Sequence, residues 1–287
     1  MVEVAVSALN LPELDWIDAS EDGRTEHWET LVDDSILARW LGQYRPTHLY
    51  IGSEFCEHLL PSKQKLRRAL QRAEAYGLRP VLLTPVASPQ VLSALTELLE
   101  LLPDETDVVV NDRGVGRLIS VHYPRLRRAA GRILCRMIKD PRLPDAGWAP
   151  QCGYGFDAPH TQSIFKRLDF QRLEMDVPMF PDDKTFDSLP LPKGVHLPYA
   201  FVAKGRMCRI GSMAIEGTQR FAVGRQCRKE CLIFTASAQR PATNDRQKTR
   251  HVGNTIFSRH TDEMLKVVMK ATEKGGIERL IVPGASL

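Results

Sequence analysis

The chain has 287 residues and a mass of 32.4 kDa, which suits one large domain or two ordinary ones and excludes a long multidomain assembly. Hydrophobic residues make up 43% and charged residues 26%, close to the globular average, so intrinsic disorder is excluded too. Lysine and arginine outnumber aspartate and glutamate by 39 to 35, an excess too small to indicate a nucleic acid or an anionic membrane as partner. Without a run of about 18 apolar residues or a signal-peptide pattern, the sequence predicts a cytoplasmic protein with no membrane span.

Short apolar runs alternate with helical patterns along the first two thirds of the chain. Pro61 and Gly77 bracket one predicted helix, and Ser88 with Pro89 starts another as N-cap and first residue. We expect strands at 2–9, 47–52, 79–87, 107–112, 131–137 and 172–178, helices at 28–41, 61–77, 88–102, 113–122 and 160–170, and a loop at 15–29. This alternation predicts a mainly parallel sheet, and we interpret it as a TIM-barrel-like α/β fold.

The pattern changes from about Phe180, where periodicity is lost and a stretch rich in cysteine, arginine and glycine begins. A helix from Asp262 to Lys274 and a strand at 278–284 are expected to end the chain. We therefore expect a single domain over residues 1–287, with a barrel-like part at 1–205 and an irregular cysteine-rich segment at 206–287 that binds a metal group and closes the fold.

Six cysteines in a chain without a secretory signal favour metal binding or redox chemistry over a disulfide framework. Cys227 and Cys231 form a C-x₃-C pair, and 18 residues separate Cys208 from Cys227. Zinc and iron–sulfur clusters both take four thiolates, and Cys56 follows a predicted strand whose end would face the same side as the other strand ends. Cys152 is an alternative fourth ligand.

Cations surround these thiols in the sequence: Lys204, Arg206, Arg209, Arg225, Arg228 and Lys229. Positive charge lowers the pKa of a thiol and offsets the negative charge of a four-thiolate cluster. The alternative is that C-x₃-C is only a pair of neighbouring cysteines on a helical turn. Cys135 lies in an apolar run and is expected to be a buried, small hydrophobic residue.

Several fragments resemble the collagenase-like peptidase family, also called the U32 peptidases, and most closely its UbiV-like branch of iron–sulfur proteins from oxygen-independent ubiquinone biosynthesis. The fragments are YIGSEFC, VVVNDRGVGRL, GRILCRMIKDPR, HLPYAFVAKGRMC and HVGNTIFS together with the C-x₃-C pair. Carried over to this chain, the resemblance implies a [4Fe-4S] cluster held by Cys56, Cys208, Cys227 and Cys231.

The resemblance further implies hydroxylation of an aromatic ring of a ubiquinone precursor without O₂, together with a homologous protein partner or a second copy, and with prephenate as the oxygen donor. Carboxylates of such a donor would require arginine. Asn111, Arg113 and Arg136 lie near predicted strand ends, and Asn254 lies in the family-like HVGN segment. These four are candidate substrate-binding residues, and solvated surface arginines and turn residues are the plainer interpretation.

Three other functions remain open. A non-catalytic, cluster-bearing scaffold subunit would also lack a dense acid–base constellation. Hydroxylation of RNA bases would use basic patches such as KQKLRR and QKTRH. Proteolysis, after which the family was named, has the weakest basis because neither H-E-x-x-H nor G-x-S-x-G occurs and a four-thiolate site leaves no position for water.

Overall fold

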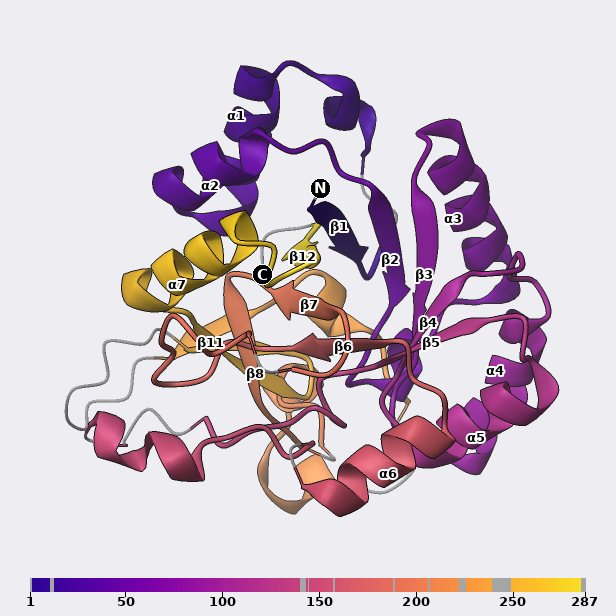
Figure 1. The fold of residues 1–287 in the computed structure, drawn as a ribbon. Coiled ribbons are helices and arrows are strands. Elements are labelled where there is room, and N and C mark those ends of the chain that lie inside the picture. The colour runs from indigo at the N-terminus through magenta and orange to yellow at the C-terminus, as the bar shows by residue number, and fades with distance from the viewer. Residues whose placement is uncertain are drawn as a thin grey trace.

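Eight parallel strands close into a barrel in the computed structural model (Figure 1). The structure describes residues 2–10, 13–139, 143, 145–156, 158–187, 189–205, 207–221, 226–238 and 249–284. The barrel strands are β1 (Glu3–Ala8), β2 (His48–Gly52), β3 (Arg79–Leu83), β4 (Asp107–Val110), β5 (Arg127–Ala130), β6 (Arg172–Met175), β7 (Lys193–His196) and β12 (Arg279–Pro283). The expected TIM-barrel-like α/β fold is confirmed.

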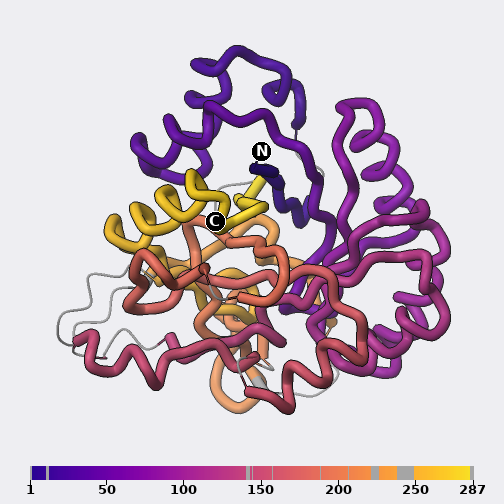
Figure 2. Tube along the Cα trace, in the orientation of Figure 1, coloured from indigo at the N-terminus to yellow at the C-terminus, as the bar shows by residue number. Residues whose placement is uncertain are grey.

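The last strand of the chain closes the ring. Strand β12 pairs in parallel with β1 on one side, where Leu280 is opposite Val4, and with β7 on the other, where Leu280 is opposite Val195. The two ends of the described chain therefore meet in the barrel wall, as the indigo and yellow ends of the tube show (Figure 2).

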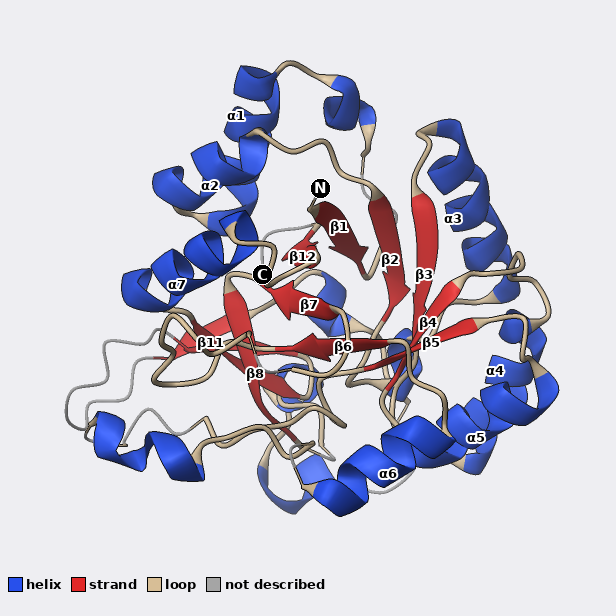
Figure 3. Ribbon diagram, in the orientation of Figure 1, coloured by secondary structure: helices blue, strands red, loops and turns tan. Residues whose placement is uncertain are grey.

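Helices cover the outside of the barrel (Figure 3). They are α1 (Glu21–Val32), α2 (Ser35–Gly42), α3 (Lys63–Ala75), α4 (Pro89–Leu99), α5 (Arg113–His122), α6 (Pro159–Arg167) and α7 (Asp262–Glu273). Short polar side chains cap several of them, because the first N–H groups of a helix have no partner within it. Ser88 accepts a hydrogen bond from the N–H of Val91, which confirms its predicted N-cap role, and Asp112 accepts from Gly114 and Val115.

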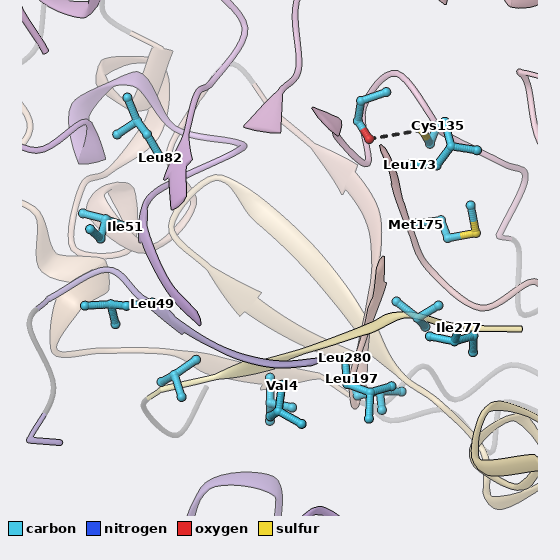
Figure 4. Close-up of a cluster of buried hydrophobic side chains, with 14 of the residues drawn as sticks. Val4, Leu49, Ile51, Leu82, Cys135, Leu173, Met175, Leu197, Ile277 and Leu280 are labelled. Atoms are coloured by element: carbon cyan, nitrogen blue, oxygen red, sulfur yellow. Dashed lines mark hydrogen bonds between the residues drawn. The ribbon is translucent and has the colours of Figure 1, made fainter. Parts of the chain in front are cut away.

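The core has two layers, because alternate residues of each strand face opposite sides of the barrel wall. Leu49 and Ile51 of β2 pack outward against the helices, in the cluster shown in Figure 4, whereas Tyr50 between them points into the barrel. Small and medium side chains fill the rest of the interior: Ala5, Val81, Leu83, Val109, Ala129 and Ile281. Both faces of the strands are thus buried, as the continuous apolar runs in the sequence predict.

Two predictions about the first connection are wrong. Residues 15–29 contain a short turn of helix and most of α1, and the expected single helix at 28–41 is split into α1 and α2. Asp33 takes a left-handed conformation with φ of 51° and ends α1, while the Asp34 carboxylate accepts hydrogen bonds from the N–H groups of Ile36 and Leu37 and starts α2. Helix α1 buries few apolar side chains, so it has no apolar stripe to reveal it.

The strand predicted at 131–137 is also wrong. The real strand, β5, ends at Ala130, and the N–H groups of Leu134 and Cys135 both bond to the carbonyl of Gly131, which makes a turn. Strand β5 has the sequence RRAA, so its arginines conceal it from a search for apolar runs. Cys135 is nevertheless buried as expected, beside Leu173 and Met175, and its thiol donates a hydrogen bond to the carbonyl of Ala130 (Figure 4).

A second, antiparallel sheet interrupts the barrel between β7 and β12. Its strand order is β8 (Tyr199–Lys204), β11 (Thr255–Arg259), β10 (Thr249–Val252) and β9 (Ala236–Ala238). Three single-turn 3₁₀ segments, η4 (Ile210–Ser212), η5 (Gly217–Phe221) and η6 (Glu230–Leu232), lie between β8 and β9. Within the described residues, every helix is too short or too polar to cross a lipid bilayer.

A charged side chain lies inside the barrel at the amino-terminal ends of the strands. The buried guanidinium of Arg279 donates hydrogen bonds of 2.7 Å to Glu3, 2.9 Å to Asp107 and 2.9 Å to the hydroxyl of Tyr50. It also lies 2.9 Å from the ring of His48, and burial together with the Arg279 charge lowers the pKa of His48 to about 2, so that this ring stays neutral. The barrel therefore holds a fixed positive charge that its acidic neighbours balance.

We predict that Arg279→Met lowers the free energy of unfolding by about 3–5 kcal/mol, since it leaves the buried Asp107 and the partly buried Glu3 with one cationic partner fewer. Urea unfolding measures the change. The matched control is Arg127→Met, whose half-exposed guanidinium contacts the same Asp107 at 2.8 Å and should contribute about 0–1 kcal/mol. An Arg279→Met protein no less stable than this control would contradict the prediction.

Candidate functional site

Five polar side chains meet at the carboxyl end of the barrel. Glu54 follows β2, Asn111 follows β4, Arg132 follows β5, Asp176 follows β6 and His196 ends β7, and all are buried. Parallel strands of a closed barrel all end on the same face, so residues up to 142 positions apart in the chain become neighbours there. This face of a barrel is where catalytic groups gather in enzymes of the fold.

Arg132 is the centre of this group. Its Nε and Nη2 atoms donate to Oε2 of Glu54 at 2.8 and 2.6 Å, and Nη1 donates to Asp176 at 3.2 Å. The Lys139 ammonium binds the other oxygen of Asp176, which also accepts a 3.1 Å hydrogen bond from the N–H of Phe201. Asp176 thus joins the barrel to the antiparallel sheet.

Burial and charge act in opposite directions on these carboxyls. Burial raises the pKa of Asp176, but the Lys139 ammonium and the Arg132 guanidinium outweigh it and hold that pKa at about 2. Burial also raises the pKa of Glu54, and the charge of Arg132 reverses the shift and lowers it. Both carboxyls are therefore ionised at neutral pH, and the guanidinium between them is neutralised.

A chain of hydrogen bonds links His196 to the far end of the barrel. Its Nε2 lies 3.1 Å from Oε2 of Glu174 and 4.0 Å from Glu54. The Tyr50 hydroxyl donates to the other oxygen of Glu174 and accepts from Arg279. The imidazole is therefore held in place through a buried carboxylate and a buried phenol.

A cavity of about 360 Å³ lies above these groups, within the lower part of the usual size range for small-molecule sites. Glu54, Arg132 and His196 line its floor. Phe55, Tyr199 and Phe257 form an aromatic wall, and the Arg132 guanidinium lies 4.9 Å from the centre of the Phe55 ring. Apolar and small side chains line the rest, among them Leu9, Leu59, Leu83, Leu197, Val252, Ile281 and Val282. The shape and lining suit a small flat molecule with a polar end.

The four predicted ligand cysteines come together at the opposite side of this cavity. Cys56 and Cys208 pack against the small apolar cluster that contains Cys231. Cys56 lies within electrostatic range of Cys208 and Cys227, and Cys231 lies within range of all three. Cys56 and Cys231 also line the cavity.

The mutual effect of the thiols is visible in their pKa values. Burial raises the pKa of Cys56, and the charges on Cys227 and Cys208 raise it further. Burial and the other three thiols raise the pKa of Cys231 to about 12. Burial and the neighbouring thiols thus act in the same direction on the pKa values of Cys56 and Cys231.

The donor atoms of the site indicate which kind of metal group the thiols could hold. Across the described ranges, no three histidine, cysteine, aspartate or glutamate side chains are close enough to hold a single metal ion. A [4Fe-4S] cluster lies between its four thiolates, which are therefore farther apart than the ligands of one ion. Four thiols are the donor set that such a cluster takes, and hydrogen bonds reach two of the sulfur atoms, from the N–H of Gly211 to Cys208 at 3.3 Å and from that of Lys229 to Cys227 at 3.4 Å.

The hairpin turn between β10 and β11 contacts the chain segments that carry Cys56, Cys208 and Cys231. Gly253 has a φ of 60°, so the turn favours a residue that is free in φ, and its Cα lies beside Cys231. The side-chain amide of the next residue, Asn254, donates to the carbonyls of Phe55 at 3.2 Å and Gly205 at 3.1 Å. Asn254 thereby ties the strand that leads to Cys208 to the residue that precedes Cys56.

Of the other predicted substrate-binding residues, Asn111 belongs to the polar group at the carboxyl end of the strands. Its buried amide accepts from the N–H of Ile133 and donates to the carbonyl of Thr84 and, at 3.5 Å, to Glu54. Arg113 and Arg136 are exposed and, with Asn111, line a second hollow that shares no lining residue with the main cavity. The two arginines therefore do not face the floor formed by Glu54 and His196.

The remaining predicted residues are Cys152 and the basic residues near the cysteines in the sequence. Cys152 is buried and is not among the residues that line the main cavity or pack around the other thiols. Of the basic residues expected around the site, Lys204, Arg209, Arg228 and Lys229 are exposed. Arg206 and Arg225 lie outside the described residues.

Sequence reasoning missed most of the cavity floor. Glu54 stands only two residues before Cys56, and Asp176 lies inside the run RLEMDVP, where we expected a strand. Arg132 was hidden because the strand before it was placed too late in the sequence. A charged residue one or two positions after a buried run is the signal that could have found all three.

No family model matches the chain, and no curated protein matches it. Similar solved structures include the U32 peptidase Mk0906, with a TM-score of 0.46 and 10% identity over 100% of this chain and 94% of that one. A group IV chitinase from Ostrinia furnacalis has a TM-score of 0.36 and 11% identity, over 98% and 91% of the two chains. The chitinase ChiW from Paenibacillus has a TM-score of 0.29 and 10% identity, over 97% and 40%. Likenesses of this size do not assign the chain to a family, and its barrel is established by its own strand pairing.

We predict that Asp176→Asn lowers stability at neutral pH by about 3 kcal/mol, because it leaves Lys139 and Arg132 buried with one partner fewer. The Asp176 carboxyl has a lower pKa in the folded protein, about 2, than in the unfolded chain, about 3.9. Its contribution is therefore complete above about pH 4 and is lost as the pH falls towards 2.

Urea midpoints measured from pH 7 to pH 2 test this prediction. The wild-type protein should lose stability between pH 4 and 2, and the Asp176→Asn variant should lose less over that interval. Asp183→Asn, which removes an exposed carboxylate beside Lys270, should follow the wild-type curve. Parallel curves for Asp176→Asn and the wild-type protein would refute the role assigned to Asp176.

Proposed function

We propose that this chain is an iron–sulfur protein that modifies a small aromatic molecule in its barrel cavity, by hydroxylation that does not use O₂. One observation carries the proposal: the cavity is lined on one side by Cys56 and Cys231 and on its floor by Glu54, Arg132 and His196. A thiolate-bound redox group and a set of proton-carrying side chains would thus act on the same bound molecule.

The cysteine site supports the first half of the proposal. Cys56, Cys208, Cys227 and Cys231 would hold a [4Fe-4S] cluster, and the N–H groups that reach Cys208 and Cys227 would stabilise the charge on their sulfur atoms. Such a cluster, when bound, supplies one-electron transfer at a potential set by its burial and hydrogen bonds. The exposed cations Arg209, Arg228 and Lys229 would offset its negative charge.

The cavity supports the second half. The rings of Phe55, Tyr199 and Phe257 would stack on a flat substrate. His196, held through Nε2 by Glu174, would carry a proton between that carboxylate and the substrate. Side chains with fixed positions and little contact with water favour proton transfer of this kind.

The charge of the floor bears on the oxygen donor. Arg132 is already neutralised by Glu54 and Asp176, so a dicarboxylate such as prephenate would find no free guanidinium there. We therefore propose the cavity as the site of the aromatic ring.

The buried charges favour catalysis over a scaffold role. Three buried carboxylates and two buried cations form one network at the cavity: Glu54, Glu174, Asp176, Arg132 and Lys139. Burial of so many charges lowers the stability of the fold, and a scaffold would have no reason to accept that loss. Proteolysis by a cysteine nucleophile is disfavoured, because Cys231 at the cavity has a pKa of about 12 and keeps its proton at neutral pH.

Protein purified without oxygen should contain about four iron and four sulfide ions per chain. Alanine at Cys56, Cys208, Cys227 or Cys231 should remove most of that iron, because each variant deletes one thiolate. Cys135→Ala and Cys152→Ala are the matched controls and should keep it. Full iron content in Cys227→Ala, or one zinc ion and no sulfide in the wild-type protein, would refute the cluster.

Cells that lack this protein and grow without oxygen should accumulate a quinone precursor that is short of one or more ring hydroxyl groups, which mass spectrometry of lipid extracts detects. The wild-type gene and the Cys152→Ala variant should restore the product, and the Cys208→Ala and His196→Ala variants should not. Normal quinone content in the deleted strain would exclude the proposed substrate while leaving the cluster to be judged by its iron.

A further inference from the structure

Three exposed apolar side chains lie at the ends of the neighbouring turns η4 and η6, beside the cysteines. Met213 is 61% exposed, Ile233 79% and Phe234 61%. Met213 directly follows η4, whose Gly211 bonds to the Cys208 sulfur, and Ile233 and Phe234 directly follow η6, which contains the buried Cys231. The thiols thus face inward, while these three side chains face solvent. We call Met213, Ile233 and Phe234 the apolar face.

The segment of the chain that carries the apolar face is rich in positive charge. Between residues 204 and 237 the sequence has seven lysine and arginine residues and only two acidic ones, although the whole chain has 39 basic and 35 acidic residues. This segment therefore holds more net positive charge than the entire chain, and the remainder is slightly acidic. Of its cations, Lys204, Arg209, Arg220, Arg228 and Lys229 are described and exposed.

We propose that this face binds a small acidic protein. An apolar centre within a charged rim is the usual anatomy of a protein interface, and complementary charge mainly raises the association rate and selects the partner. Electron carriers commonly bind through small, transient interfaces of this type. The partner's task rests on the proposed iron–sulfur function, whereas the binding itself rests only on the apolar face and its charged rim.

Two other occupants fit this surface less well. A second copy of the chain, joined by a twofold axis, would place the same cations opposite one another, which costs free energy. RNA without a stable duplex is bound by several stacked aromatic rings, whereas the apolar face offers one ring, Phe234, beside the aliphatic Ile233 and Met213. Charge and composition together favour an acidic protein.

An acidic plant-type [2Fe-2S] ferredoxin is a suitable probe, with binding measured by titration calorimetry under nitrogen. We expect Phe234→Glu and Arg228→Glu to weaken binding about tenfold or more, and higher salt to weaken binding by the wild-type protein. Ile36→Glu introduces the same acid at a 70% exposed isoleucine on α2, and Arg67→Glu reverses an exposed charge on α3. Both controls should bind as the wild-type protein does.

Each other outcome overturns the proposal. Failure of the wild-type protein to bind ferredoxin, or equal weakening by Arg67→Glu and Arg228→Glu, would show that no docking site exists here. Dimerisation in sedimentation that Phe234→Glu abolishes would assign the face to a second copy, and tighter binding of a single-stranded RNA oligonucleotide would assign it to RNA. Iron analysis of every variant separates this test from the proposed function: Phe234→Glu should keep its iron and lose only the partner.

Discussion

The closure of the barrel by its last strand determines the rest of the structure. Strand β12 must lie between β7 and β1, yet the chain leaves the barrel after His196 and returns only at Arg279. The intervening residues form the antiparallel sheet and the cysteine-rich turns at the carboxyl end of the strands. Cys208, Cys227 and Cys231 reach Cys56 because this excursion starts and ends at the barrel wall.

The two polar regions inside the barrel have different tasks. Arg279, with Glu3 and Asp107, balances charge at the amino end and does not line the cavity. Glu54, Arg132, Asp176 and His196 lie at the carboxyl end, and Glu54, Arg132 and His196 reach the cavity surface. Tyr50 and Glu174 connect the two regions by hydrogen bonds. The first region maintains the fold, and the second gives the cavity its chemistry.

The sequence predicted the barrel because its strands are buried on both faces and so form apolar runs, and it predicted α5 to the residue because its apolar face repeats at helical spacing. It failed at β5, where Arg128 is buried by bonding to main-chain carbonyls and not by being apolar, and at α1, which depends on capping by Ser20 more than on an apolar stripe. The four cysteines could be singled out because thiols are rare and their spacing is distinctive. Glu54, Arg132 and Asp176 could not, because common charged residues acquire a role only when strand ends that are distant in sequence meet.

The side-chain NH₂ group of Asn254 donates to two main-chain carbonyls, those of Phe55 and Gly205, and the turn beside it packs Gly253 on Cys231. The relative position of the cysteine-bearing segments is thus set by the polypeptide itself. In small zinc domains, by contrast, metal uptake drives folding. The proposed cluster would therefore enter a protein that is already folded, and iron starvation would leave a folded protein that can still take up the cluster.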